Sequence, residues 1–349
     1  MKDIKLKTTL AAIVALFLLA ACLPEQAAAR CEAGRPTGRV VVAAEHGDYV
    51  TITEALAAIC PDAAHPIVID VMPGTYTENI TMKDYMHLRG AGTGVTTLQS
   101  ASATADVIVV DHLTHVTISG FTITGGGTGI HNIFSTPVIR ENTITANAIL
   151  GIMNEDSSPT ITGNVVANNS GNAGIRNLNS SPVIDGNTIA GNRDGIFNAG
   201  SSPIIRNNTI SGNHLSGINN SVSSPTIQGN TISNNQGVGI GNINSAPIIT
   251  ANTIIGNVSA GIYNLSSTPL ITGNTITRNS FVGIRILSIS SPMIVHNRIT
   301  DNGGATPLDI EVELGSIPNI SFNVYDSIIG TTGVGAYNLK SDGSPAPVT

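Results

Sequence analysis

Four charged side chains have types and spacing that could combine a cation site with a base. They are Arg176, Asp185, Asp194 and Arg206. Asp carboxylates are suited to holding a cation such as Ca²⁺, and an arginine can remove a proton from a uronate, as lyase chemistry requires. Because no Lys occurs between Lys83 and Lys340, the strongly basic side chains of this stretch are arginines. The simpler interpretation is a surface ion pair between Asp185 and Arg206, which fall one repeat apart.

A second group of side chains occupies one position in each copy of a repeat, directly after a recurrent Ile. Strand alternation turns these side chains outwards, away from the Ile. The column contains His131, Met153, Arg176, Phe197, Asn219, Gly241, Tyr263 and Arg285. Aromatic rings and guanidinium groups suit a polysaccharide, above all an acidic one, through stacking and charge-assisted hydrogen bonds. The expected glycan-binding residues are His131, Arg176, Phe197, Tyr263 and Arg285; the alternative is a varied solvent face without a ligand.

The composition argues against several other functions. The chain has 349 residues, a net charge of −7 and only five Lys, so it offers no basic face for nucleic acid. Its eight His are scattered, and His112 and His115 form the only close pair, so no metal site is expected. Gly125, Gly126 and Gly127 lack the Lys and the helix of a nucleotide-binding loop. No cofactor is expected, and calcium would be needed only by a lyase.

The outward side chains are carried by a repeat of 21 to 23 residues that occurs eight times. Proline marks the copies at Pro137, Pro159, Pro182, Pro203, Pro225, Pro247, Pro269 and Pro292. Three further positions, which begin at Ile130, Ile139 and Ile144, are Ile in every copy except at Val166. Each lies in a short β-branched segment bounded by Gly, Asn, Ser or Pro, which indicates a strand. Three short strands per 22 residues without crossovers predict an all-β solenoid, a parallel β-helix with eight regular coils over residues 125–302.

Polar columns run beside the Ile columns. Three are Asn columns that begin at Asn132, Asn142 and Asn147, and a fourth is a Ser column that begins at Ser135; the first Asn column is interrupted at Ile286. Asn tolerates the left-handed backbone of a sharp bend, and stacked amides can form a hydrogen-bonded ladder. We therefore interpret these columns as structural, although metal or sugar ligation is the functional alternative.

The flanks of the repeat are less regular. Residues 48–59 predict a capping helix with Thr51 or Thr53 as N-cap, at the end of an N-terminal segment of residues 22–60. Residues 61–124 are expected to form irregular first coils, with strands over 67–71, 86–89, 107–110 and 116–118 and a turn over 73–76. Residues 303–349 are expected to form a C-terminal cap and a loose tail.

The first 21 residues have the basic start and short apolar stretch of a signal peptide. They end before Cys22 in a sequence that resembles the lipobox of bacterial lipoproteins, in which this Cys is lipidated. Cleavage after the Ala27-Ala28-Ala29 segment, with release of a soluble protein, is the alternative. Cys31 and Cys60 then remain as a disulfide pair in an oxidising compartment, or as two free thiols. We expect an extracytoplasmic protein, anchored by lipid at the outer membrane or surface, or else periplasmic or secreted.

The chain resembles the right-handed parallel β-helix proteins of the pectate lyase-like superfamily over about residues 40–325. Repeats such as residues 184–192 and 271–279 look like those of NosD-like bacterial proteins, and residues 49–56 with 73–78 are similar to the start of pectinesterases. The resemblance implies a right-handed β-helix. The catalytic motifs of pectinesterases, polygalacturonases and alginate epimerases are absent from this sequence.

Three functions remain open. The first is a non-catalytic module that binds carbohydrate or a cell surface, with a polysaccharide or glycan as its partner and contact with a membrane only through a lipid anchor. The second is a polysaccharide lyase or a pectinesterase-like enzyme acting on an acidic glycan. The third is a structural surface repeat without a ligand.

Overall fold

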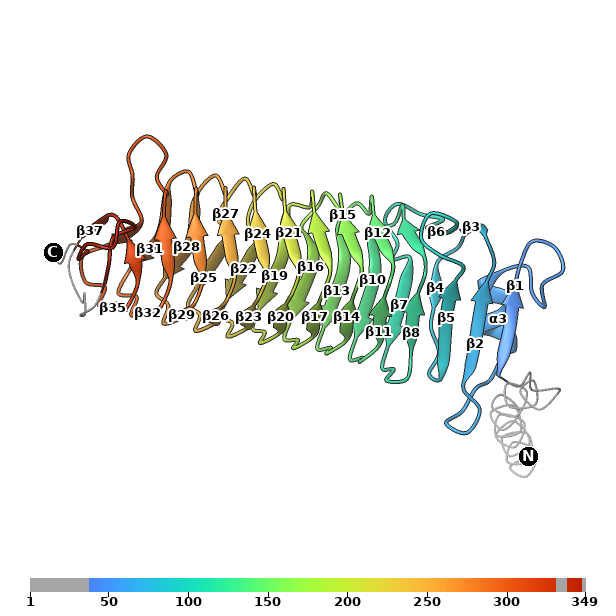
Figure 1. Ribbon diagram of the computed structural model, residues 1–349. Coiled ribbons are helices and arrows are strands. Elements are labelled where there is room, and N and C mark those ends of the chain that lie inside the picture. Colours follow the sequence, from blue (N-terminus) through green and yellow to red (C-terminus); the bar gives the residue numbers. More distant parts are fainter. Residues whose placement is uncertain (1–37, 331–337, 347–349) are drawn as a thin grey trace, which may run out of the picture.

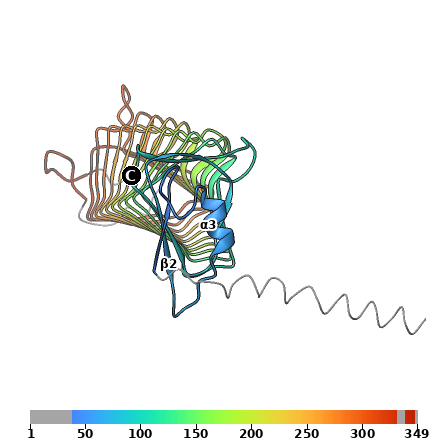
Figure 2. The ribbon, with the colours of Figure 1, turned by 90° about the vertical axis from the view of Figure 1, so that its right-hand side faces the viewer.

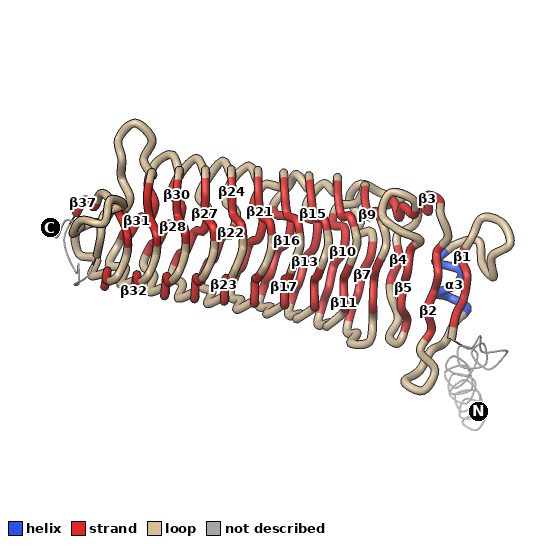
Figure 3. Tube along the Cα trace, in the orientation of Figure 1, coloured by secondary structure: helices blue, strands red, loops and turns tan. Residues whose placement is uncertain are grey.

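The computed structural model describes residues 38–330 and 338–346, which form a solenoid of stacked coils (Figure 1). Each coil contributes one short strand to each of three sheets, and all pairings between these strands are parallel. The coils lie one above another, so the view along the long axis shows them superposed, with the helix α3 (Ile52–Ala58) at the N-terminal end (Figure 2). Figure 3 shows that each coil consists of short strands joined by turns and loops.

Sheet I has 13 strands. They are β1 (Arg39–Val42), β2 (Ile67–Val71), β5 (Met86–Gly90), β8 (Thr117–Ser119), β11 (Val138–Arg140), β14 (Thr160–Thr162), β17 (Val183–Asp185), β20 (Ile204–Arg206), β23 (Thr226–Gln228), β26 (Ile248–Thr250), β29 (Leu270–Thr272), β32 (Met293–Val295) and β35 (Asn319–Ser321).

Sheet II follows sheet I along each coil and has 12 strands. They are β3 (Gly74–Thr77), β6 (Thr96–Gln99), β9 (Thr122–Thr124), β12 (Thr143–Thr145), β15 (Val165–Ala167), β18 (Thr188–Ala190), β21 (Thr209–Ser211), β24 (Thr231–Ser233), β27 (Thr253–Ile255), β30 (Thr275–Thr277), β33 (Arg298–Thr300) and β36 (Val324–Tyr325).

Sheet III completes the coil, also with 12 strands. They are β4 (Ile80–Thr81), β7 (Ile108–Asp111), β10 (Thr128–Ile133), β13 (Leu150–Glu155), β16 (Ala173–Leu178), β19 (Asp194–Ala199), β22 (Ile218–Ser221), β25 (Ile240–Ile243), β28 (Ala260–Leu265), β31 (Val282–Leu287), β34 (Ile310–Val312) and β37 (Ile328–Gly330).

The predicted three-strand coil is confirmed. The columns that begin at Ile130, Ile139 and Ile144 lie in sheets III, I and II, and every member of the three columns in the eight repeats is fully buried. Burial of one such Ile contributes about 1.5–3 kcal/mol relative to exposure. Strands β34 to β37 continue all three sheets beyond Asn302, so part of the segment expected as cap and tail extends the solenoid.

Buried hydrogen-bond ladders run along the inside of the corners. Asn142 Nδ2 donates to Asn164 Oδ1 at 3.1 Å, and the backbone N–H of Asn142 donates to the same oxygen at 3.0 Å. The column that begins at Asn147 repeats this pattern, and in the Ser column the N–H of Ser135 donates to Ser157 Oγ at 2.9 Å. These contacts satisfy polar groups that would otherwise be buried without a partner.

The predicted role of Asn in the bends is wrong. None of the ladder Asn residues has a positive φ; the residue before each corner ladder residue has it instead, as at Glu141 (φ 56°), Ala146 (φ 54°) and Phe134 (φ 45°). The column of Asn132 does not lie at a corner at all, because Asn132 is inside β10. The ladder bonds hold the left-handed residue in place, so many residue types occur there despite its intrinsic cost.

The N-terminal part of the solenoid differs from the expected elements in two places. Helix α3 begins after Thr51, which forms a capping box with Glu54, and its residues Ile52, Ala55 and Leu56 are buried. The helix is shorter than the predicted span. Residues 74–77 are not a turn but strand β3, because they pair in register with β6. Within the described residues, no helix is long and apolar enough to cross a lipid bilayer.

Candidate functional site

The outward column on sheet III has the geometry that the repeat predicts. In this register His131 lies beside Met153, Met153 beside Arg176, and so on through Tyr263 and Arg285, one residue per coil. Adjacent parallel strands are about 4.8 Å apart. The five predicted glycan-binding residues, His131, Arg176, Phe197, Tyr263 and Arg285, are all partly exposed on this face.

His131 lies between two carboxylates. Its Nδ1 is 2.8 Å from Asp106 Oδ2, and its Nε2 is 3.5 Å from Glu155 Oε2. The hydrogen bond to Asp106 raises the pKa of His131 above its ordinary value, against the opposing effect of burial, and Glu155 acts in the same direction. Burial alone would raise the pKa of Asp106, but hydrogen bonds from His131 and Thr128 bring that pKa below its ordinary value. The group is therefore a charged imidazolium held by carboxylates at mildly acidic pH.

Arg176 has the fewest polar partners among the charged side chains of the column. Its guanidinium carbon lies 5.8 Å from the centre of the Phe197 ring, a cation–π distance. Within the described residues Arg176 has no ion pair, and its Nε is buried without a hydrogen-bond partner. Beside it, Leu150, Met153 and Ala173 form a small apolar cluster outside the main core, which Phe197 contacts. Chemically, a cation can bind a carboxylate, and an aromatic ring with an apolar patch can contact the apolar face of a ring-shaped molecule.

At the other end of the column, the positive charge of Arg285 is balanced by a neighbouring carboxylate. Its Nε lies 2.8 Å from Glu311 Oε2 in the next coil, and its guanidinium carbon lies 5.1 Å from the centre of the Phe281 ring. Tyr263 occupies the position one coil before Arg285. Between Phe197 and Tyr263 the column carries only Asn219 and Gly241. The two aromatic residues of the column are thus separated by two coils with small side chains.

The family of the chain follows from its coils. A family model described as "Right handed beta helix region" matches residues 106–248 and 243–341, which together span more than half of the sequence. The chain belongs to this right-handed β-helix family. The resemblance expected from the repeats is thereby confirmed.

Solved structures share the fold of this β-helix protein. It is similar to the Dettilon tailspike protein, with a TM-score of 0.64 and 16% identity over 88% of this chain and 68% of that chain. It is also similar to the A-module of the Azotobacter vinelandii mannuronan C-5 epimerase AlgE6, with a TM-score of 0.53 and 17% identity over 79% of this chain and 93% of that chain.

A third similar structure is the catalytic domain of a GH87 α-1,3-glucanase in complex with tetrasaccharides. Its TM-score is 0.56 and its identity 15%, over 87% of this chain and 69% of that chain. A comparison with curated proteins found no match. At these identities the similarities establish the fold alone.

The charged cluster predicted for the β-helix protein is not brought together. Asp185 and Arg206 pair on sheet I, with Arg206 Nε 2.9 Å from Asp185 Oδ2, whereas Arg176 and Asp194 lie on sheet III. The reason is the length of the coil. Residues nine positions apart, as Arg176 and Asp185 are, fall on different faces, and only a separation of one full repeat returns the chain to the same column.

Asp194 lies in a strand of sheet III. It is the first residue of β19, it is buried, and its Oδ1 accepts the backbone N–H of Ser216 at 2.9 Å. Burial raises the pKa of Asp194, although the hydrogen bonds from Ser216 and the charge of Arg193 oppose this shift. The side chain supports the neighbouring coil and is not placed to hold a cation.

The structure offers no transition-metal site within the described residues, where no group of three His, Cys, Asp or Glu side chains could hold an ion. His112 and His115 do not act as a pair. His112 contacts Asp111 and Phe134, whereas His115 contacts Asp84 and Tyr85.

The sequence pattern did not indicate the two carboxylates that contact His131, namely those of Asp106 and Glu155. Asp106 precedes the regular repeats, and Glu155 lies in a neighbouring outward column, two residues after Met153. The second could have been found by placing the outward columns of β10 and β13 side by side. Cys60 is disulfide-bonded, whereas Cys22, Cys31 and the predicted signal peptide lie outside the described residues.

Proposed function

We propose that this β-helix protein binds an acidic polysaccharide or cell-surface glycan along the outer face of sheet III without cleaving it. The observation that carries the proposal is Arg176, a half-buried guanidinium without an ion pair in the described structure, beside Phe197 and an apolar cluster. A guanidinium can bind a carboxylate in a bidentate manner, and the ring can stack on the apolar face of a sugar. The fold is shared with a mannuronan epimerase and an α-1,3-glucanase, which supports a polysaccharide as the ligand.

Binding of the full chain to polygalacturonate and alginate, with neutral dextran as comparison, tests this proposal. Arg176→Gln is expected to weaken binding about tenfold or more, since a charge-assisted hydrogen bond contributes about 1.5–3 kcal/mol. The double variant Phe197→Ala/Tyr263→Ala is expected to weaken it as well. Arg206→Gln is the matched control, because Arg206 is exposed on sheet I. The proposal fails if the two Arg variants bind equally well; the absence of binding to any glycan would favour a purely structural repeat.

A second candidate function is catalysis on an acidic polysaccharide, and the His131 group favours it. An imidazole oriented by a carboxylate is a common general acid or base. The group lies on the same face as Arg176, which could hold the substrate carboxylate. Assays for unsaturated uronate products and for new reducing ends would detect this activity. His131→Gln should abolish it, and Asp185→Asn on sheet I should not.

We further propose that the protein is extracytoplasmic and anchored through a lipid on Cys22. The basic and apolar start of the chain supports this localisation, and so does the disulfide at Cys60, because disulfides persist in oxidising compartments. Mass spectrometry of the mature N-terminus tests it. A diacylglycerol-modified Cys22 is expected, and an N-terminus after the Ala27-Ala28-Ala29 segment would support a released protein.

A further inference from the structure

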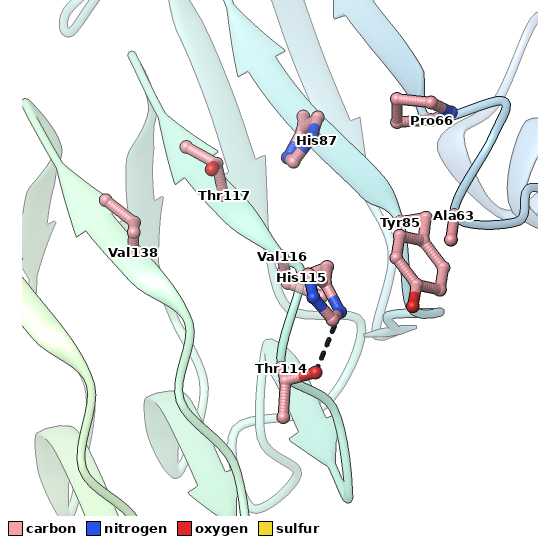
Figure 4. A pocket seen from close by; sticks show the side chains of 9 residues that line it. All are labelled: Ala63, Pro66, Tyr85, His87, Thr114, His115, Val116, Thr117 and Val138. Atoms are coloured by element: carbon pink, nitrogen blue, oxygen red, sulfur yellow. Dashed lines mark hydrogen bonds between the residues drawn. The ribbon is translucent and has the colours of Figure 1, made fainter.

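A pocket of about 480 Å³ lies on the outer face of sheet I, in the irregular N-terminal coils (Figure 4). Its volume is within the range of small-molecule sites, which is about 300–1,000 Å³. The pocket lies on a different face from the outward column of sheet III, because the strands that line it, β5, β8 and β11, belong to sheet I. All lining residues of the pocket except Val138 precede the regular repeats, which begin at residue 125.

The floor of the pocket is a row of three outward side chains. His87 on β5 lies beside Thr117 on β8, which in turn lies beside Val138 on β11. Within the described residues His87 Nδ1 is buried and has no hydrogen-bond partner. Burial lowers the pKa of His87, and the charge of His115 acts in the same direction. His87 is therefore a neutral imidazole at neutral pH, with an unsatisfied nitrogen next to the Thr117 side chain.

One wall of the pocket is an aromatic platform. The rings of Tyr85 and His115 are stacked, with centroids 4.4 Å apart and an interplanar angle of 15°. Figure 4 shows both rings beside the row of His87 and Thr117. Ala63 and Pro66 complete the lining on the side of the loop before β2.

Asp84 keeps this wall in position. Its Oδ1 accepts the backbone N–H groups of Thr114 at 3.1 Å and His115 at 2.6 Å, and its Oδ2 lies 3.2 Å from His115 Nδ1. The carboxylate is thereby occupied by the loop and is not presented to a ligand. The wall is built before any ligand arrives, which lowers the entropic cost of binding.

We propose that this pocket binds one neutral sugar ring, such as a hexose or an N-acetylhexosamine, as a second glycan site on a different face from the acidic-glycan site. The sugar hydroxyls would satisfy His87 Nδ1 and the Thr117 hydroxyl, and the apolar face of the ring would rest on the Tyr85 ring. The lining residues include no Arg or Lys and no Asp or Glu, which suits a neutral sugar. The site does not depend on the function proposed for sheet III.

Titration of the full chain with the methyl glycosides of glucose, galactose and N-acetylglucosamine, followed by ligand-observed NMR, tests this site. His87→Ala and Tyr85→Asn are expected to weaken binding about tenfold or more, because each removes one of the two main contacts. Phe134→Asn is the matched control. Phe134, like Tyr85, has a positive φ and a ring against a His, but it does not line the pocket.

Thr117→Val keeps the size of the side chain and removes only the hydroxyl, so its expected loss of affinity does not depend on a change in folding. The proposal is overturned if the wild-type chain binds none of the three glycosides, or if the pocket variants bind them as well as Phe134→Asn does. Arg176→Gln is expected to leave this binding unchanged while it weakens polygalacturonate binding. The proposals for the two sites can therefore be refuted independently of each other.

Discussion

Arg206 donates a hydrogen bond from Nε to Asp185 Oδ2 across the boundary between two consecutive coils of sheet I, at 2.9 Å. The two residues occupy the same outward position one repeat apart. Asn207 Nδ2 donates to the other oxygen of the same carboxylate, also at 2.9 Å. Both oxygens of Asp185 are therefore engaged within the protein, which argues for a structural pair and not for a reactive acid.

This pair is expected to contribute little to stability. Its side chains are 48% and 28% exposed, and exposed ion pairs contribute about 0–1 kcal/mol. A double-mutant cycle with Asp185→Asn and Arg206→Gln, followed by urea unfolding, should give a coupling free energy in that range, smaller at high salt. A coupling free energy of several kcal/mol would show that the pair is far less solvated than its exposure indicates.

The His131 group predicts a pH dependence of stability. The folded-state pKa of His131 is raised, so its stabilising contribution is fully present below about 6.5, its ordinary pKa, and is lost as the pH rises through the folded value. The pKa of Asp106 is lowered, so its contribution is lost only as the pH falls through that lowered value. The difference in melting temperature between the wild type and His131→Gln should thus be largest between these limits and smaller at pH 8–9. A difference that does not vary with pH would contradict the assigned contacts.

Asp194 predicts a stabilising substitution. Burial raises its folded-state pKa, so its favourable contribution is present below about 3.8 and is lost as the pH rises through the folded value. Asp194→Asn keeps an acceptor for the Ser216 N–H and removes the buried charge. The variant should melt at a higher temperature than the wild type at pH 7, and the gain should vanish at low pH. Asp185→Asn, at a partly exposed position, should show no such gain.

The Asn ladders predict a large cost for the loss of one amide. Asn208 Oδ1 accepts from both nitrogens of Asn187, and Asn208 Nδ2 donates to Ile184 O, Arg206 O and Asn230 Oδ1. Asn208→Ala should destabilise the protein by about 2–5 kcal/mol, because several buried groups lose partners that are each worth about 1–3 kcal/mol.

Hydrogen exchange is the appropriate measurement for Asn208→Ala, since a solenoid can open locally and need not unfold in one step. Exchange should accelerate in the coils on both sides of Asn208. The neighbouring Thr209→Ala, at an exposed outward position, should change stability by no more than about 0.5 kcal/mol. Equal effects of the two variants would mean that the ladder contributes no more than a solvent-facing hydroxyl.

The fold could be predicted because the same short sequence pattern occurs in eight copies and indicates the same three strands in each. The three columns are Ile in every copy except at Val166, so each copy indicates the same strands and the copies support one another. Corner geometry could not be predicted in the same way. The left-handed position is occupied by Glu141, Ala146 or Val222 as readily as by Gly163, since tertiary hydrogen bonds and not residue type hold it there.

The candidate sites were predictable only where they follow the repeat. The Asp185–Arg206 pair and the column of Arg176 and Phe197 follow from register alone. The carboxylate that holds His131, Asp106, comes from a coil without the repeat, and the pocket at His87 is lined mainly by residues that precede the regular repeats.

The ladders also place no limit on the number of coils that the solenoid can contain. Each coil offers to the next the same donors and acceptors that it receives from the previous one, and only the ends differ, as where Asn302 passes its ladder bond to Asp309. No contact in the interior of the described coils fixes their number. Duplication or deletion of one whole unit in the gene would therefore change the reach of the protein while leaving both ends intact, whereas a single residue inserted within a strand would move the side chains that follow it in that strand to the opposite face.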